Sequence, residues 1–508
     1  FLRLLFFALR GARGYATMAM IRVEHLTFSY PSSYDAVFED VSFQIDTNWK
    51  LGFIGRNGRG KTTFLRLLLG QYEYAGRIDA PVSFDYFPYE AAGRDRPAAA
   101  VLAEVCPGAQ AWELERELSC LGVGQEALER PFGTLSPGEQ TKALLAALFL
   151  NEGRFLLIDE PTNHLDAEAR RRVAAYLKRK RGFILVSHDR QFLDGCVDHI
   201  LALNRADIQV QSGNYSTWAE NFARRQKEEQ DRNDRLKKEI GTLQKAARRT
   251  ANWSDRVEAS KFGTGVADRG FVGHKAAKMM KRAKVLENRR QRAIEEKSGL
   301  LKNLEIVEDL KIFPQPYFAR TLAALTDVAP VYDGRAVCAP VRFTVEQGDR
   351  IALEGGNGSG KSSLLRLLAG AGIAHTGTVT VGSGVVLSCV PQDAGFLRGD
   401  LREFTEQRQI DETLFKTILR KMGLERAQFE KGMEDLSAGQ KKKVLLAASL
   451  CQRAHLYLWD EPLNYLDIDC RVQIERLIRE FAPTMVFVEH DGAFREAVAT
   501  RTVQVERR

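Results

Sequence analysis

Hydrophobic and polar positions along the chain predict two regions of strands and helices with a long helical region between them. Apolar segments of strand length, separated by short turns, occupy residues 21–30, 36–45 and 50–55. Over residues 218–250 and again over 276–305, apolar side chains recur at helical spacing on a highly charged background, which is typical of amphipathic helices. We therefore expect an antiparallel helical hairpin, in which helices of about 30 residues would each be roughly 45 Å long.

A glycine-rich loop follows the third predicted strand and is followed by an apolar helix. The order of strand, GxxxxGK[ST] loop and helix is that of a phosphate-binding loop, in which glycines let backbone N–H groups approach the phosphates. Lys61 is expected to reach the β- and γ-phosphates of ATP, and Thr62 to ligate Mg²⁺. A glycine-rich turn that arose by chance is the alternative, which the flanking strand and helix disfavour. The predicted nucleotide contacts are Gly55, Asn57, Gly58, Gly60, Lys61, Thr62 and Thr63.

The same strand, loop and helix recur about 300 residues later. Four landmarks repeat with offsets of 300 to 302 residues, namely Lys61 and Lys361, Ser136 and Ser437, Glu160 and Glu461, and His188 and His490. A single offset held across the chain indicates duplication of a whole domain. The second loop adds the predicted nucleotide contacts Gly355, Asn357, Gly358, Gly360, Lys361, Ser362 and Ser363.

Two apolar segments, residues 155–160 and 456–461, each end in an Asp-Glu pair. An Asp at the end of a buried strand can hold Mg²⁺ through water, and the following Glu can orient and deprotonate an attacking water. Carboxylates exposed on the surface are the alternative, which the repetition disfavours. The predicted magnesium residues in the two halves are Thr62, Asp159, Ser362 and Asp460, and the predicted general bases are Glu160 and Glu461.

Five motifs occur twice in the same order and name a family. Besides the phosphate loops and the Asp-Glu strands, they are LSPGE at 135–139 and LSAGQ at 436–440, PTNHLD at 161–166 and PLNYLD at 462–467, and LVSHD at 185–189 and FVEHD at 487–491. In these motifs the chain resembles ATP-binding cassette domains. The predicted fold class is therefore α/β, with two tandem ATP-binding cassette domains joined by a long antiparallel α-helical hairpin linker.

The resemblance implies two composite ATP sites, each made by the phosphate loop of one cassette and the LSxG helix of the other. Ser437 and Gly439 would complete the first site, and Ser136 and Gly138 the second. It further implies that Tyr30 and Tyr332 stack on adenine, that His188 and His490 contact the γ-phosphate, and that Gln392 senses Mg²⁺ and water. Packing tyrosines and core histidines are the plainer alternatives. Tyr89 stands where the first cassette should carry the glutamine, so we expect unequal sites.

Length and composition agree with this organisation. A chain of 508 residues needs two or three domains, and its seven cysteines, scattered and never spaced as CxxC, favour reduced thiols in a cytosolic protein. Residues 1–22 contain Arg but no acid, so an organellar presequence stays open, although we favour translated upstream sequence before Met18 or Met20. The predicted domains are an extension at 1–19, a first cassette at 20–217, a basic linker at 218–312 and a second cassette at 313–508.

Positive charge is concentrated in the predicted linker. Residues 245–292 hold fourteen Lys and Arg against four Asp and Glu, a net +10 in a chain of net +8. Basic groups for phosphates with aromatic rings for unstacked bases are what folded RNA requires, whereas a solvated charged face is the alternative. The predicted RNA contacts are Trp253, Lys261, Phe262, Arg269, Phe271, Lys275, Lys278, Lys281 and Arg282, with Trp253, Phe262 and Phe271 in a glycine-broken tip between the two helices.

With this linker, residues 20–508 resemble the ABC-F translation factors, and stretches such as DTNWKLGFIGRNGRGKTT and HKAAKMMKRAK resemble their Lsa-type antibiotic-resistance group. The resemblance implies a cytoplasmic, ribosome-associated ATP hydrolase that needs ATP and Mg²⁺ and works as a monomer with an intramolecular cassette dimer. Its partners would be the bacterial 70S ribosome, 23S rRNA and P-site tRNA, without DNA or a membrane domain. A housekeeping translation factor and the ATPase subunit of a drug exporter remain alternatives.

Overall fold

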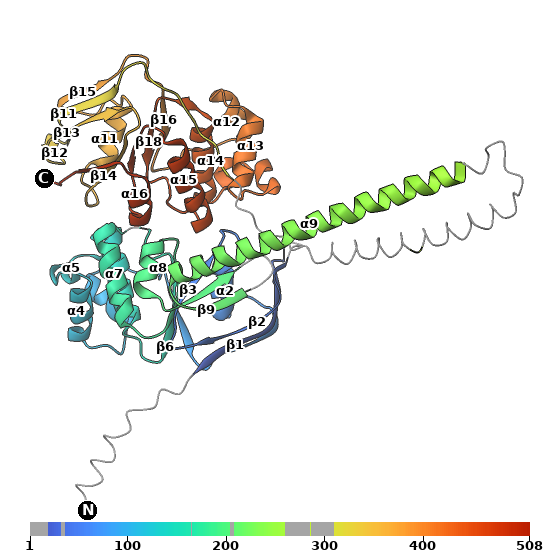
Figure 1. Ribbon diagram of the computed structural model, residues 1–508. Coiled ribbons are helices and arrows are strands. Elements are labelled where there is room, and N and C mark those ends of the chain that lie inside the picture. Colours follow the sequence, from blue (N-terminus) through green and yellow to red (C-terminus); the bar gives the residue numbers. More distant parts are fainter. Residues whose placement is uncertain (1–18, 32–35, 164, 204–207, 260–284, 286–308) are drawn as a thin grey trace, which may run out of the picture. The chain divides into compact units, whose positions relative to one another are not determined.

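The computed structural model describes residues 19–31, 36–163, 165–203, 208–259, 285 and 309–508. The chain divides into two compact units, Phe1–Ser216 with Val307–Arg508, and Thr217–Ile306. We call residues 19–216 the first half and residues 309–508 the second half. Both halves belong to the first of these units (Figure 1).

The first half contains an antiparallel three-stranded sheet and a six-stranded sheet of order β5-β6-β7-β3-β8-β9. The six-stranded sheet is parallel except for its last pair, and its central strands are apolar and buried on both faces, as parallel sheets covered by helices require. The strands are β1 (Met20–Ser29), β2 (Ala36–Asp46), β3 (Lys50–Gly55), β4 (Ala75–Asp79), β5 (Ser83–Phe87), β6 (Arg154–Asp159), β7 (Phe183–Val186), β8 (His199–Leu203) and β9 (Ile208–Ser212).

The helices of the first half follow the strands closely. Asp166 and Asp189 cap two of them, because their carboxylates accept the N–H groups of Ala169 at 2.9 Å and Phe192 at 3.0 Å. The helices are α2 (Lys61–Leu68), α3 (Ala98–Val105), α4 (Ala111–Cys120), α5 (Glu126–Glu129), α6 (Pro137–Leu148), α7 (Ala167–Arg179) and α8 (Arg190–Cys196), with a 3₁₀ turn at Phe132–Thr134.

The second half repeats this plan, as the offset of about 300 residues predicts. A parallel sheet of order β16-β18-β19-β14-β20 lies beside an antiparallel sheet built on β11, and a short parallel pair joins β10 to β17. The strands are β10 (Phe313–Pro314), β11 (Thr321–Tyr332), β12 (Arg335–Ala336), β13 (Val341–Glu346), β14 (Arg350–Glu354), β15 (His375–Val381), β16 (Leu387–Val390), β17 (Arg453–Ala454), β18 (Leu456–Asp460), β19 (Met485–Val488) and β20 (Arg501–Gln504).

The core of the second half forms on both faces of its parallel sheet, where Tyr457 and Trp459 are fully buried. Trp459 donates its Nε1–H to Ser449 Oγ at 2.9 Å, which satisfies its one polar group. The helices are α11 (Lys361–Leu368), α12 (Leu401–Gln407), α13 (Glu412–Lys421), α14 (Ala438–Cys451), α15 (Ile468–Phe481) and α16 (Gly492–Val498), with 3₁₀ turns at Arg426–Glu430 and Met433–Asp435.

Helix α9 (Tyr215–Ala259) is the 45-residue helix with which the linker begins (Figure 1). It confirms the helix predicted over 218–250 but corrects its end, because residues 251–259 are helical and Trp253 is therefore not in a loop. The reason lies in the composition, since the first glycine after the predicted end is Gly263. The helix predicted over 276–305 and the tip residues 260–275 lie outside the described residues, apart from Val285 in the former.

Candidate nucleotide sites

Both phosphate loops have the conformation that their glycines predict. Gly60 and Gly360 precede helices α2 and α11 with φ of 97° and 91°, in the left-handed region. A Cβ atom on Gly60 would lie 2.4 Å from Val37 Cγ1, so a larger residue does not fit there. Around Gly58 and Gly358, none of the residues that the structure describes lies within 4 Å of such an atom, so the described part of the chain leaves space beside each loop.

The lysine of each loop lies across its own backbone. Lys61 Nζ donates to the carbonyl oxygens of Gly55 at 2.7 Å and Arg56 at 3.1 Å, and Lys361 Nζ donates to those of Gly355 and Gly356, both at 2.9 Å. Burial is the largest cause that lowers the pKa of Lys61, and the nearby carboxylate of Glu160 opposes it. Each lysine is the first residue of its helix. Its ammonium group and the positive end of the helix dipole both favour an anion at this position.

The predicted magnesium residues meet in both halves. Thr62 Oγ1 donates to Asp159 Oδ2 at 2.8 Å, and in the second half burial raises the pKa of Asp460 while the neighbouring Ser362 side chain opposes this shift. Among the described residues, Asp460 Oδ1 is a buried oxygen without a hydrogen-bond partner. A hydroxyl beside one carboxylate, next to a phosphate loop, is the ligand set that suits Mg²⁺ carried with a nucleotide. These residues therefore fit a magnesium–nucleotide complex.

The glutamates after strands β6 and β18 have strained backbones. Glu160 and Glu461 have φ of 50° and 46°, in the left-handed region that non-glycine residues adopt uncommonly. Their N–H groups donate to Val186 and Val488, both at 2.9 Å, which holds this conformation. The result is that each carboxylate lies 3.4 Å from a histidine Nε2, of His188 in the first half and His490 in the second.

The two glutamates differ in their surroundings. Burial, followed by the neighbouring Asp159 carboxylate, raises the pKa of Glu160 to about 8. Burial opposes ionisation of Glu461 as well, but hydrogen bonds from His490, Gln392 and Asn464 outweigh it and lower the pKa of Glu461 to about 2. Equivalent positions in the repeat thus hold one carboxyl group whose pKa is raised and one whose pKa is lowered.

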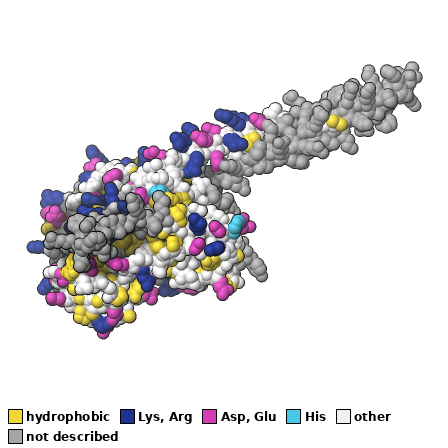
Figure 2. All heavy atoms as spheres, turned by 90° about the horizontal axis from the view of Figure 1, so that it is seen from below, with side chains coloured by type: hydrophobic (Ala, Val, Ile, Leu, Met, Phe, Trp, Pro, Cys, Tyr) yellow, Lys and Arg dark blue, Asp and Glu magenta, His cyan; other side chains and the backbone are white. Residues whose placement is uncertain are grey.

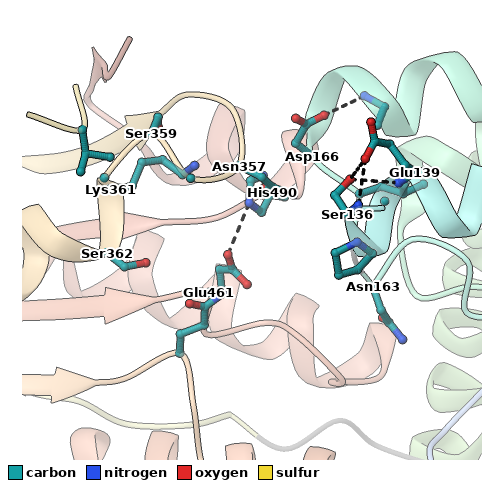
Figure 3. A pocket seen from close by; sticks show the side chains of 18 of the residues that line it. Ser136, Glu139, Asn163, Asp166, Asn357, Ser359, Lys361, Ser362, Glu461 and His490 are labelled. Atoms are coloured by element: carbon teal, nitrogen blue, oxygen red, sulfur yellow. Dashed lines mark hydrogen bonds and ion pairs between the residues drawn. The ribbon is translucent and has the colours of Figure 1, made fainter. Parts of the chain in front are cut away.

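The second composite site is a cavity of about 620 Å³ lined by both halves (Figure 3). Figure 3 shows Ser136, Glu139, Asn163 and Asp166 from the first half opposite the second phosphate loop. Ser136 caps helix α6, because its Oγ accepts the N–H of Glu139 at 3.3 Å while Glu139 Oε2 accepts the N–H of Ser136 at 2.8 Å. The cavity brings together the predicted residues Ser136, Gly138, Tyr332, Asn357, Gly358, Gly360, Lys361, Ser362, Ser363, Gln392, Glu461 and His490.

At the first site the phosphate loop touches the second half directly. Asn57 Nδ2 donates to the carbonyl oxygen of Tyr465 at 2.9 Å, and its backbone N–H donates to Asp467 Oδ2 at 3.4 Å. Gly439 lies against the same segment, since a Cβ atom there would be 2.7 Å from Tyr465 O and 3.6 Å from Asn57 Nδ2. Ser437 caps helix α14, with its Oγ accepting the N–H of Gln440 at 3.3 Å. The structure thus brings Asn57 and Gly439 together from opposite halves.

The two tyrosines predicted to stack on adenine lie beside the phosphate-loop helices. Tyr30 OH is 2.7 Å from Thr63 Oγ1, and Tyr332 OH is 3.0 Å from Ser363 Oγ. The ring of Tyr30 packs edge-on against Phe28, with the ring centroids 5.1 Å apart, whereas Tyr332 is 45% exposed and borders the cavity. The stacking of these tyrosines on adenine stays a prediction. Of the two, Tyr332 is the more exposed to solvent.

Sequence reasoning missed several polar residues near the sites. Arg170 Nη1 and Asp189 Oδ2 form a buried ion pair at 2.9 Å next to His188, and Arg471 Nη1 and Asp491 Oδ2 form its copy at 3.2 Å. Comparing residues at the offset of the repeat could have identified these pairs, since both occur in both halves. The same comparison could not have identified Lys442, because its equivalent in the first half is Thr141. Its buried Nζ donates to the carbonyl oxygens of Pro391 at 2.9 Å, Gln392 at 3.2 Å and Asp460 at 3.1 Å.

Tyr89, which takes the place of the expected glutamine, is 43% exposed. Strand β5, which ends just before Tyr89, brings Tyr86 to the first site, where its hydroxyl donates to Asp159 Oδ2 at 3.1 Å. Nothing in the sequence distinguished Tyr86, since it precedes the loop in which the glutamine is expected. The predicted RNA contacts other than Trp253 lie outside the described residues, and of the side chain of Trp253 the structure describes nothing.

Comparisons with known proteins agree with the geometry. The ABC transporter family matches residues 38–163 and 338–464, which contain both phosphate loops and both Asp-Glu pairs. The chain therefore has two tandem ATP-binding cassette domains and is an ATP hydrolase. Among the described residues, no helix has the length and apolar character that a membrane span requires.

The chain is 27% identical to the ribosome protection protein VmlR of Bacillus subtilis, over 92% of this chain and 84% of that protein. It is 26% identical to the energy-dependent translational throttle protein EttA of Haemophilus influenzae, over 91% and 88%. A structure of the archaeal ribosome recycling factor aABCE1 with the stalk protein aP1 matches with a TM-score of 0.63 and 19% identity, over 94% and 87%, which shows the fold alone. The matches to the ribosome protection protein and to the translational throttle protein, taken with the two cassettes, support a protein of the ABC-F family.

Proposed function

We propose that this protein is a ribosome-bound ATPase of the ABC-F type that protects ribosomes from antibiotics. In this proposal it enters the exit site, and its basic linker acts on P-site tRNA and the peptidyl-transferase centre of 23S rRNA. There it displaces lincosamide, streptogramin A and pleuromutilin drugs, and ATP hydrolysis drives its release. The observation that carries the proposal is the second composite site, in which residues of both halves line one cavity. The likeness to a ribosome protection protein supports the choice of partner.

The distribution of charge along the linker supports contact with RNA through the residues that follow residue 244. Figure 2 shows Lys and Arg mixed with Asp and Glu along the described part of that helix. Residues 218–244 hold seven basic and six acidic side chains, whereas residues 245–292 carry a net +10. Because the excess of positive charge begins only after residue 244, residues 245–292 are the part of the linker sequence that suits a polyanion.

In the proposed mechanism Lys61 and Lys361 bind the phosphates, and the LSxG helices supply Ser437 and Ser136 from the opposite half. Bound Mg²⁺ would offset the charge of the β- and γ-phosphate oxygens at Thr62 with Asp159 and at Ser362 with Asp460. Glu160 and Glu461 take a proton from the attacking water, and His188 and His490 orient the γ-phosphate. Loss of the γ-phosphate removes the ligand that both halves share, so the halves separate.

Co-sedimentation with bacterial ribosomes tests the proposal. The Glu160→Gln, Glu461→Gln variant should pellet with 70S ribosomes in the presence of ATP and not without it, because ATP that persists keeps the halves closed. Absence of pelleting despite measured ATP binding would exclude the ribosome as partner. Lincosamide, streptogramin A and pleuromutilin susceptibility of a sensitive bacterium expressing the protein then tests resistance itself, and unchanged susceptibility would refute it.

A housekeeping role at the same ribosomal site is the second candidate, which the match to the translational throttle protein favours. Rescue of stalled synthesis in the absence of drug, with unchanged susceptibility, would support this role. An ATPase subunit of a drug exporter is the third candidate, and it predicts that the protein lowers drug accumulation in cells. Measuring drug efflux with and without the protein separates it from the other two.

The RNA contact has its own test in the salt dependence of ribosome binding. Neutralising four basic residues should lower affinity and flatten the dependence of its logarithm on salt, by up to about 0.9 per lost phosphate contact. The variant replaces Lys275, Lys278, Lys281 and Arg282 with Gln. The matched control replaces four residues of the charge-balanced part of helix α9, Arg224, Arg225, Lys237 and Lys238. Equal slopes for the wild type and both variants would refute contact through this segment.

A further inference from the structure

The last residues of strand β5 bring a phenol to the first ATP site. Tyr86 OH donates to Asp159 Oδ2 at 3.1 Å, and the same oxygen accepts the hydroxyl of Thr62 at 2.8 Å. One carboxylate oxygen is thereby fixed by two donors from two different elements.

The second site lacks this phenol. Strands β5 and β6 pair Tyr86 with Leu157, and strands β16 and β18 pair Cys389 with Leu458, which is the copy of Leu157 in the repeat. Cys389 thus takes the place of Tyr86, and a thiol is only a weak donor. In the second half the polar residue of this segment is Gln392, which lines the same cavity as Glu461. Equivalent segments therefore bring different polar residues to the two sites, Tyr86 onto Asp159 in the first and Gln392 into the cavity of the second.

We propose that Tyr86 is a positioning residue of the first ATP site, where it fixes the Asp159 carboxylate for magnesium. The inference rests on the proposed magnesium role of Thr62 and Asp159. Side chains that hydrogen-bond a metal-binding carboxylate set its orientation, and losing one typically lowers metal affinity by about 10- to 100-fold. The first site thus compensates for its missing glutamine with a phenol that holds the metal side of the site.

Tyr86→Phe tests this role, because it removes one oxygen and leaves the ring. In the Glu461→Gln variant, where hydrolysis is confined to the first site, Tyr86→Phe should raise the half-saturating Mg²⁺ concentration about 10-fold or more. In the Glu160→Gln variant, where only the second site turns over, the same substitution should leave it unchanged. The matched control is Tyr89→Phe, which removes an exposed hydroxyl from the same segment and should shift neither value.

A second readout does not depend on hydrolysis. Mn²⁺ binding in the presence of a non-hydrolysable ATP analogue can be followed by electron paramagnetic resonance. In Tyr86→Phe, one of the two sites should bind Mn²⁺ about 10-fold more weakly or worse, and the other should be unchanged. Binding of the analogue without metal should stay the same. A shift of less than twofold in both measurements would overturn the role of Tyr86. Equal weakening at both sites would also overturn it, since that result indicates a general loss of structure. If wild-type protein shows no Mg²⁺ dependence, the proposed magnesium site itself is wrong.

Discussion

In the first ATP site Glu160 has a raised pKa and a neighbouring carboxylate supported by Tyr86, whereas in the second site Glu461 has a lowered pKa and hydrogen bonds from His490, Gln392 and Asn464. The backbone strain is the same, with φ of 50° and 46°, and each glutamate lies 3.4 Å from a histidine Nε2. Asn464 and His490 recur in the first half as Asn163 and His188, so the motif residues alone do not account for the opposite directions of the two pKa shifts.

The largest expected effect is loss of the second general base. Glu461→Gln should reduce steady-state ATP hydrolysis at pH 7 by about 10²- to 10⁴-fold at its own site. Glu160→Gln should have a smaller effect on total turnover at this pH, because the raised pKa of Glu160 leaves a smaller ionised fraction of this base than of Glu461. ATP hydrolysis by the two single variants measures this difference. Equal losses would show that the two bases contribute equally despite their different surroundings.

The buried lysine of the second half should have the next largest effect. Lys442→Met removes the donor from three carbonyl oxygens, so we expect loss of about 2 to 3 kcal/mol of stability in the second half. The matched substitution in the first half, Thr141→Val, should cost about 1 kcal/mol or less. Denaturant unfolding of both variants provides the measurement. Similar losses of stability in the two variants would mean that Lys442 stabilises the second half no more than Thr141 stabilises the first half.

The dependence of kcat/KM on pH should differ between the two sites by about tenfold between pH 7 and 9. A carboxyl group must be ionised to accept a proton, so a base with a pKa of about 8 gains activity as the pH rises from 7 to 9, about tenfold in kcat/KM. A base with a pKa of about 2 is ionised throughout and gives a flat profile. We expect the rising profile in Glu461→Gln and the flat one in Glu160→Gln. Two parallel profiles would contradict the assignment.

The smallest expected effect concerns contact between the halves at the first site. Arg56 Nε donates to Asp469 Oδ2 at 2.7 Å, while the second phosphate loop has Gly356 at the equivalent position. Arg56→Gly should weaken ATP-dependent closure by no more than about 1 kcal/mol, because both side chains are partly exposed. The effect should decrease with added salt. Fluorescence of labels on the two halves, followed during ATP titration at two salt concentrations, measures it.

Much of the fold followed from the chain itself, because the repeated motifs are local. The strands ending in Gly55 and Asp159 and the helices beginning at Lys61 and Pro137 lie where periodicity and motif order place them. The end of helix α9 was misplaced, since no glycine or proline occurs between residues 251 and 259 to end it. Tyr89 stood out from the motif but is exposed, and Tyr86 is the residue that reaches Asp159.

By itself, the sequence determined the two cassettes, their phosphate loops and the Asp-Glu pairs, since each motif places its chemical groups within a few residues of one another. Only the tertiary structure decided how those groups are protonated and supported. Strand register brings Tyr86 to Asp159, which is 73 residues away in the chain, and burial raises the pKa of Glu160 whereas the surroundings of Glu461 lower its pKa. Register and burial depend on residues far apart in the chain, so two similar sets of motifs form chemically different sites.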